Sequence, residues 1–267
     1  MASNIILIPI YKQTMTVWEN KSFRQCLKVL GKHKIGIFTF EDLDTNRYSQ
    51  IAKEFNICID YYYFNKTYFS SVKGYNKLML TKDFYKRFHE YQYMLIYQLD
   101  AWVFRDELDY WCDQGYDYIG APVYNYLGNG KYATENPFVG NGGFSLRKIP
   151  YCMKVLSYPS FLPFIKPLNY IKTYREKIKW YAILPNALGR RNNIRDFINR
   201  YNEDIIFSHF TSESFMKIKM PDIKTAIRFA FEMYPSKLYQ INNFELPFGC
   251  HAFEKYEFEL FWHKHIV

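Results

Sequence analysis

The chain has 267 residues, long enough to bury the core of one large α/β domain or two small ones. Its hydrophobic content of 49% excludes general disorder, and no apolar stretch reaches the roughly 18 residues of a membrane-spanning helix. The 35 Lys and Arg against 26 Asp and Glu leave a formal charge of +9, which favours an anionic partner such as a nucleotide, a phospholipid surface or nucleic acid.

The N-terminal half alternates apolar runs with helical spacing. Strands are expected at 5–9, 35–40, 57–64, 93–99 and 116–122, and helices over 23–30, 42–55 and 72–90. Strands separated by helices predict βαβ units with right-handed crossovers. We therefore expect an α/β fold with a Rossmann-like, mostly parallel central sheet and flanking helices.

The second half is less regular. A Gly-rich turn leads into a short strand before 148, and helices are expected over 149–157 and 197–208. The segment 166–200 carries nine basic residues against two acidic ones; it is typical of a solvated helical face, or of a surface that contacts anionic lipid. No linker interrupts the sequence, so one domain over 1–267 is expected, with halves 1–122 and 123–267 and a basic helical segment at 160–200.

The cysteine pattern and the N-terminal sequence both bear on the cellular compartment in which the protein is expected. The five cysteines are widely spaced without a CxxC pair, which indicates reduced thiols and gives no support for a zinc site. The N-terminal residues lack the basic region of a signal peptide. We expect a cytoplasmic protein, with peripheral contact to the inner face of a membrane as a further hypothesis.

Asp100 ends the apolar run of the strand at 93–99, where ligands bind in open parallel sheets. Burying a lone carboxylate is costly, so Asp100 needs a positive partner. A divalent cation held against a nucleotide diphosphate is one such partner. A structural role, capping a turn or pairing with Arg105, is at least as probable on spacing alone.

Three other stretches carry candidate chemistry. Gly140, Gly142 and Gly143 let a backbone approach a ligand closely, although alone they predict only a turn. Glu203 and Asp204 open an apolar helical pattern, where a carboxylate either favours the helix N-terminus or acts as a general base. A lone histidine such as His251 is more often structural than a ligand.

Together and in this order, these stretches resemble a GT-A-type glycosyltransferase, and in particular a bacterial family described mainly as a domain of unknown function with presumed sugar-transfer activity. The resemblance rests on "YNKLML", "YQLDAWVF", "YDYIGAP", "VGNGGFSLR", "NEDIIFS" and "PFGCHAF", which span most of the chain outside 160–195. As a set they are fairly specific, although no single one is.

The resemblance implies a role for individual residues. The donor nucleotide would meet Pro9, Ile10, Tyr11, Lys77, Asp100, Ala101 and Trp102. The sugar and the acceptor would meet Asn141, Gly142, Gly143, Phe144 and Ser145. Asp204 would be the catalytic base with Glu203 beside it, and His251 would complete a metal or diphosphate site with Asp100.

The chain departs from the family pattern at Trp102, where the second carboxylate of a DxD motif would stand. One carboxylate with phosphate oxygens can still hold Mn²⁺ or Mg²⁺, with water or His251 completing the shell. A metal-free site would instead neutralise the diphosphate with Lys77 or the basic segment. The metal is slightly favoured.

The expected function is transfer of a sugar from a nucleotide-sugar donor, preferably a UDP-sugar, to a hydroxyl of a glycan or lipid-linked glycan, in surface glycan or polysaccharide biosynthesis. A base at Asp204 predicts inversion, whereas retention stays open if Asp204 only caps a helix. Two other classes remain: a non-catalytic carbohydrate-binding or inactive transferase-like module, and a nucleic-acid-binding protein. A nucleic-acid-binding protein fits the charge and the 21% aromatic content, but that function does not explain Asp100 and Asp204. No nucleic-acid partner is therefore expected.

Overall fold

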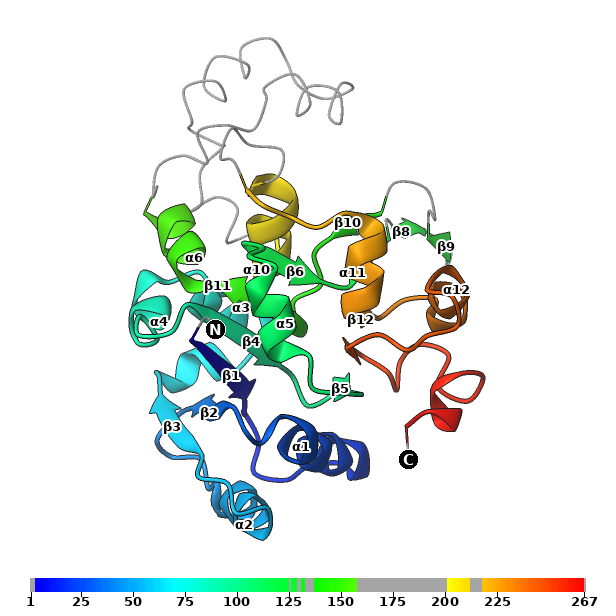
Figure 1. The fold of residues 1–267 in the computed structure, drawn as a ribbon. Helices are drawn as coiled ribbons and strands as arrows, with labels where there is room; N and C mark the ends of the chain where they lie inside the picture. Colours follow the sequence, from blue (N-terminus) through cyan, green and yellow to red (C-terminus); the bar gives the residue numbers. More distant parts are fainter. Residues whose placement is uncertain are drawn as a thin grey trace.

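The computed structural model describes residues 3–124, 137–157, 201–211 and 218–266, together with the backbone of 126–128 and 131–132. Figure 1 shows these residues as a central sheet with helices on both faces and a C-terminal region beside it. Within these ranges, no helix has both the length and the apolar character needed to cross a membrane.

The central sheet has six strands in the order β3-β2-β1-β4-β11-β6. Their bounds are β1 Asn4–Pro9, β2 Lys34–Thr39, β3 Asp60–Tyr63, β4 Tyr93–Tyr97, β6 Tyr118–Gly120 and β11 Phe144–Lys148. The pairs β2–β3, β1–β2 and β1–β4 are parallel, whereas β11 is antiparallel to both β4 and β6. The expected α/β class with a mostly parallel sheet is therefore confirmed.

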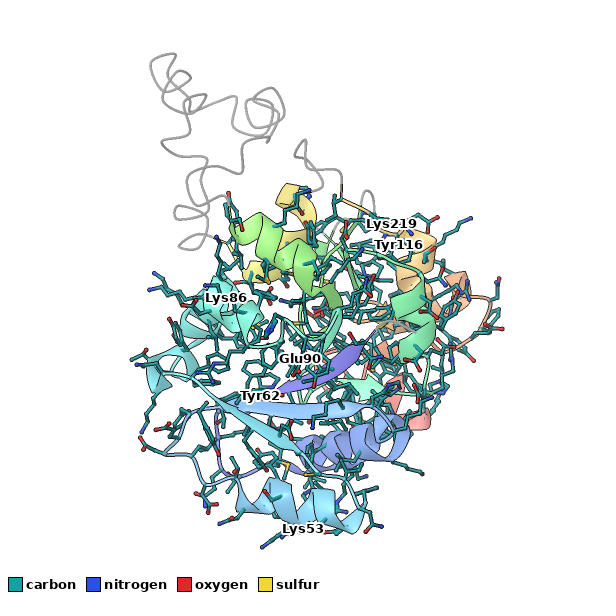
Figure 2. All side chains as sticks on the ribbon, turned by 60° about the vertical axis from the view of Figure 1, so that its left-hand side comes forward. Lys53, Tyr62, Lys86, Glu90, Tyr116 and Lys219 are labelled. Carbon is teal, nitrogen blue, oxygen red and sulfur yellow. The ribbon has the colours of Figure 1, made fainter. Side chains whose placement is uncertain are left out.

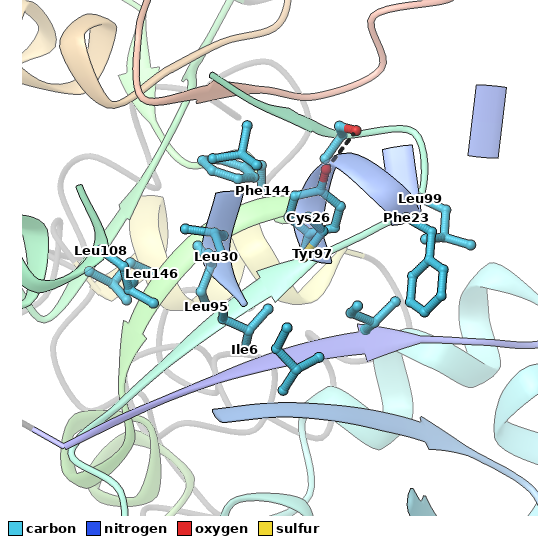
Figure 3. Packing of buried hydrophobic residues seen from close by; sticks show 14 of the residues in the cluster. Ile6, Phe23, Cys26, Leu30, Leu95, Tyr97, Leu99, Leu108, Phe144 and Leu146 are labelled. Atoms are coloured by element: carbon cyan, nitrogen blue, oxygen red, sulfur yellow. Dashed lines mark hydrogen bonds between the residues drawn. The ribbon is translucent and has the colours of Figure 1, made fainter. Parts of the chain in front are cut away.

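The apolar runs of the central strands exist because both faces of the sheet are covered. Along β1, Ile6 and Ile8 belong to a cluster with residues of the helices α1 (Val17–Leu30), α2 (Asn46–Glu54) and α5 (Leu108–Asp113). Figure 3 shows part of this cluster, with Ile6 near Leu95. Ile5 and Leu7 point to the opposite face, against α3 (Val72–Met79), α4 (Lys82–Lys86) and α6 (Ile149–Leu156). The alternation follows the two-residue period of a strand.

The C-terminal region forms a third apolar cluster around a small sheet in the order β12-β13-β5. The bounds here are β5 Trp102–Val103, α11 Ile223–Phe229, β12 Ala230–Phe231, α12 Pro235–Ile241 and β13 Gly249–Cys250. Because β13 pairs with β5, which follows β4 by a short turn, the C-terminal residues return to the end of the central sheet. That return brings His251 beside Asp100.

The remaining elements are short. They are η1 Lys66–Phe69, β7 Pro122–Val123 paired with β10 Phe138–Val139, β8 Tyr126–Gly128 paired with β9 Lys131–Tyr132, α10 Glu203–Ile205, η3 Ile206–Phe210 and η4 Trp262–Lys264. Figure 2 shows side chains filling the space between these layers, with exposed lysines such as Lys53 and Lys86 at the periphery.

The structure corrects two predicted elements. The helix expected over 72–90 is two helices, because the side chain of Thr81 accepts a hydrogen bond from the Phe84 amide and begins α4 anew. The strand expected over 116–122 ends at Gly120, and Pro122 pairs in a separate ribbon. The helix expected over 197–208 falls partly outside the described residues; its described part is α10 followed by a wider π-type turn.

Candidate functional site

A cavity of about 740 Å³ opens at the carboxyl ends of the parallel strands β1 and β4, where open α/β sheets bind ligands. Its volume lies within the range of small-molecule sites. It is lined by Pro9–Lys12, Glu19, Tyr48, Phe69–Val72, Tyr75, Asn76, Gln98–Asp100, Val123, Tyr124, Asn141–Gly143, Asn202–Ile205, Glu232, Met233, His251 and Tyr256. Ten of the residues singled out in the sequence thus share one cavity.

At one side of the cavity, His251 lies between two carboxylates. Its Nε2 is 3.2 Å from Oδ1 of Asp100 and 3.2 Å from Oε1 of Gln98, and its Nδ1 is 3.1 Å from Oε1 of Glu232. The other oxygen of Glu232 accepts a hydrogen bond from Asn141 Nδ2 at 2.8 Å. The five polar side chains therefore form one connected network on the cavity wall.

The charges in this network favour a protonated imidazole. Burial lowers the pKa of His251, but the charges and hydrogen bonds of Asp100 and Glu232 outweigh burial and raise it to about 10. For Asp100, burial raises the pKa, and the charge and hydrogen bond of His251 outweigh that effect and lower it below its ordinary value. With 44% of its side chain exposed, Asp100 is also open to a ligand. The alternative partner Arg105 pairs instead with Glu107.

Asp204 occupies another part of the cavity wall, at the start of α10. Its Oδ1 accepts a hydrogen bond from the Ile205 amide at 2.7 Å. Burial and the neighbouring charge of Glu203 raise the pKa of Asp204 from 3.8 to about 7. A carboxyl group that titrates near neutral pH and faces a cavity is suited to general base catalysis.

Glu203 is held in a different way from Asp204. Both of its carboxylate oxygens accept from the buried guanidinium of Arg147, at 2.7 and 2.9 Å, and its amide donates to Asn76 Oδ1 at 2.7 Å. Only 3% of Glu203 is exposed. The predicted pair of carboxylates is thus divided into a buried ion pair at Glu203 and a cavity-facing group at Asp204.

Two glycines connect the two sides of the site. A Cβ on Gly143 would lie 2.0 Å from His251 Nε2, and a Cβ on Gly142 would lie 3.0 Å from the Cβ of Asp204. No real Cβ tolerates the first distance. The turn therefore requires glycine so that the backbone can pass directly beneath His251, and it places successive residues against the two ionisable groups.

Five of the predicted site residues do not line the cavity. Lys77 is exposed and lines a separate surface hollow with Asn65, Thr67 and Lys73. Ala101 and Trp102 are buried, with the Trp102 ring against Phe253 in the C-terminal cluster. Phe144 packs in the core, and Ser145 donates to the Gly142 carbonyl at 2.8 Å. The basic segment 160–200 lies outside the described residues.

The side chains of the cavity can be compared with those that a divalent cation needs as ligands. Among the described residues, no group of three or more His, Cys, Asp or Glu side chains is arranged to hold a metal ion. Asp100 and His251 nevertheless converge, and Glu232 orients the other ring nitrogen of His251 as partners of metal-bound histidines do. Asp100 and His251 fit a cation that takes its remaining ligands from water and substrate phosphates, and binding of the cation would have to displace the Nε2 proton of His251, because only neutral imidazole coordinates a metal ion.

Sequence reasoning missed three residues of the site, although each carried a sign of its role. Glu232 interrupts the apolar run "FAFEMY" just as Asp100 ends the run before it. Arg147 follows the apolar residues of a strand that is buried from Phe144 to Arg147, so it needed a buried counterion. Gln98 directly follows Tyr97, the last residue of β4, where ligands are expected.

The match to a family model covers residues 58–251, and the family is described as "Protein of unknown function (DUF5672)". The chain belongs to this family. The matched region of this DUF5672 protein includes Asp100 and Asp204 and ends at His251. No curated protein matches the sequence.

Among solved structures, this DUF5672 protein is similar to several glycosyltransferases. The galactosyltransferase LgtC, solved with donor and acceptor sugar analogs, has 12% identity and a TM-score of 0.49 over 92% of this chain and 86% of LgtC. Core-mannan synthase A from Aspergillus fumigatus, in a Mn/GDP form, has 9% identity and a TM-score of 0.43, covering 78% of this chain and 69% of its own. A glycosyltransferase involved in glycosylation of the major capsid of PBCV-1 has 10% identity and a TM-score of 0.45, covering 99% and 100%.

Proposed function

We propose that the protein is a glycosyltransferase that moves a sugar from a nucleotide-sugar donor, preferably a UDP-sugar, to a hydroxyl group. One observation carries the proposal: the Asp204 carboxyl group, with a pKa of about 7, and the Asp100–His251 pair line the same cavity, and Gly142 and Gly143 connect them. Such a site offers a base and an anchor for a charged leaving group, which are the two elements that sugar transfer requires.

In this proposal, the donor diphosphate lies against Asp100 and His251. Asp100 and His251, once His251 has lost its Nε2 proton, would hold a divalent cation there, and such a cation would supply positive charge against the departing diphosphate. The nucleoside would extend towards Pro9, Ile10 and Tyr11 after β1, which line the same cavity. Tyr11 is 58% exposed and offers an aromatic face to a base.

The transfer step follows from Asp204. Its ionised carboxylate takes the proton of the acceptor hydroxyl, the acceptor oxygen forms a bond to the anomeric carbon, and the bond from that carbon to the diphosphate oxygen breaks with its electron pair. Attack from the face opposite the leaving group inverts the anomeric centre. Glu203 cannot share this role, because both of its oxygens are taken by Arg147.

Release of nucleoside diphosphate from a panel of nucleotide-sugars, with and without candidate acceptors, tests the proposal directly. We expect turnover with one donor class, reduced on the order of 10²–10⁴-fold in Asp204→Asn with donor affinity retained. Full turnover in Asp204→Asn would remove the base assignment. Donor binding without any turnover would favour a carbohydrate-binding module instead.

A further inference from the structure

The most deeply buried charge of the site belongs to a residue that the proposed chemistry does not use. Arg147, on β11, is fully buried, and its guanidinium makes four hydrogen bonds. Two reach the Glu203 carboxylate at 2.7 and 2.9 Å, one reaches Ser145 Oγ at 3.0 Å, and one reaches the Gly142 carbonyl at 3.2 Å. Its cation also lies 5.3 Å from the centre of the Tyr118 ring.

Burial of this ion pair is poorly explained by stability alone. Removing two charges from water costs about as much as their attraction returns, and apolar replacements of similar volume are often as stable. What a guanidinium adds is geometry, since its planar fork fixes a carboxylate in two directions at once. The geometry here joins two walls of the cavity.

One wall is the start of α10. Glu203 is fixed through its side chain by Arg147 and through its amide by Asn76, so the peptide that leads into Asp204 has little freedom to move. The other wall is the Gly142–Gly143 turn, whose carbonyl at Gly142 accepts from the same guanidinium. Gly142 is also the residue whose absent Cβ faces Asp204 at 3.0 Å.

We propose that Arg147 is a positioning residue, which sets the separation between the Asp204 carboxylate and the Gly142–Gly143 turn where the sugar would lie. This inference rests on the proposed function, and it assigns the buried arginine to the alignment of that reaction. Arg147 itself touches no substrate. An error of about 1 Å in such an alignment costs on the order of 10²-fold in rate.

Five ionisable or charged groups face Asp204 from the surrounding elements: Glu203 on α10, Arg147 on β11, Glu232 after β12, Tyr75 on α3 and Tyr118 on β6. The charge of Glu203 raises the pKa of Asp204, and that of Arg147 lowers it. The electrostatic and positional effects of Arg147 can therefore be separated by choice of variant.

Arg147→Lys keeps the positive charge but cannot reach Glu203, Ser145 and Gly142 together. We expect kcat to fall on the order of 10²-fold, with KM for the donor and the pH midpoint of the kcat profile unchanged. Glu203→Gln removes a negative charge and leaves Arg147 uncompensated, so the midpoint moves to lower pH. The matched control is Arg24→Lys, because Arg24 makes the same forked contact to Glu54 on the surface, at 2.6 and 3.1 Å.

A second measurement does not depend on activity. The difference in unfolding stability between the parent and its Asp204→Asn variant changes with pH around the Asp204 pKa, near 7 in the wild type. In the Arg147→Met/Glu203→Met background, which leaves no unpaired buried charge, we expect this midpoint to fall towards 4 and below the midpoint of Glu203→Gln, because Asp204 swings into water in addition to losing the charge of Glu203. If no sugar donor is turned over, this result still supports the positioning role.

The proposal is overturned by any of three results. Arg147→Lys could retain wild-type kcat, or it could lose donor affinity in the same proportion as kcat, which indicates general loss of structure. The Asp204 midpoint in the double-methionine background could also be no lower than in Glu203→Gln. Arg24→Lys should match the wild type in every assay.

Discussion

The sharpest consequence of the structure concerns Asp204 and the pH dependence of stability. The pKa of this carboxyl group rises from 3.8 to about 7 on folding. Between these values the folded protein holds a proton that the unfolded chain has released, so rising pH favours unfolding. The stability contributed by the proton is complete below about pH 4 and is lost as the pH passes 7.

The magnitude follows from the shift. About 3 pKa units at about 1.4 kcal/mol each correspond to about 4 kcal/mol. Asp204 lines the cavity and is only partly buried, so solvent screening reduces this figure and we expect about 2–4 kcal/mol in practice. Asn at this position imitates the protonated form at every pH and should remove this part of the pH dependence.

Denaturant unfolding of the wild type and Asp204→Asn at pH 4, 5.5, 7 and 8.5 measures the effect. The two proteins should have similar stability at pH 4, and the variant should be more stable by about 2–4 kcal/mol at pH 8.5. Because other groups titrate equally in both proteins, the difference isolates residue 204. Parallel curves across this range would refute the reasoning, since Asp204 would then have an ordinary pKa.

Three further predictions concern the cavity wall. Gly143→Ala should abolish donor binding, because its Cβ would displace His251. Gly142→Ala, whose Cβ would lie 3.0 Å from the Cβ of Asp204, should bind donor and lose mainly kcat. Isothermal titration and turnover assays separate the two effects. Trp102→Asp should not create a second metal ligand, but should destabilise the fold by about several kcal/mol because it buries a charge. Thermal melting in comparison with Trp102→Phe measures this loss. Improved metal binding by Trp102→Asp would contradict the prediction. Glu232→Gln should weaken metal-dependent donor binding about 10–100-fold by releasing the His251 ring, and unchanged affinity would exclude that role.

The spacing of apolar residues predicted those helices and strands in which a single helical or strand period dominates. The strand at 5–9 and the helix around 23–30 are present because their apolar residues face packed layers. The break near residue 80 was missed, because the hydrogen bond that the Phe84 amide donates to the Thr81 side chain begins a new helix without interrupting the apolar pattern. The antiparallel insertion of β11 between β4 and β6 depends on long-range pairing, which local periodicity does not report.

The site was predicted unevenly for a related physical reason. Asp100 stood out because a carboxylate at the end of an apolar run needs a partner. The partner, His251, lies 151 positions away in the chain and reaches Asp100 only because β13 pairs with β5. Arg147 and Glu232 are likewise charged residues next to apolar ones, which indicates that each needs a partner. Their partners become evident only when the strands are assembled.

The central claim is that the cavity binds a nucleotide-sugar through Asp100 and His251. Thermal-shift measurement against UDP-, GDP-, CMP- and dTDP-sugars, each with Mn²⁺, Mg²⁺ or EDTA, tests it most directly, because a ligand of the native state raises its melting temperature. We predict a rise for one donor class, preferably the UDP-sugars, that EDTA removes and that Asp100→Asn lacks. No rise with any donor under any condition would contradict the account.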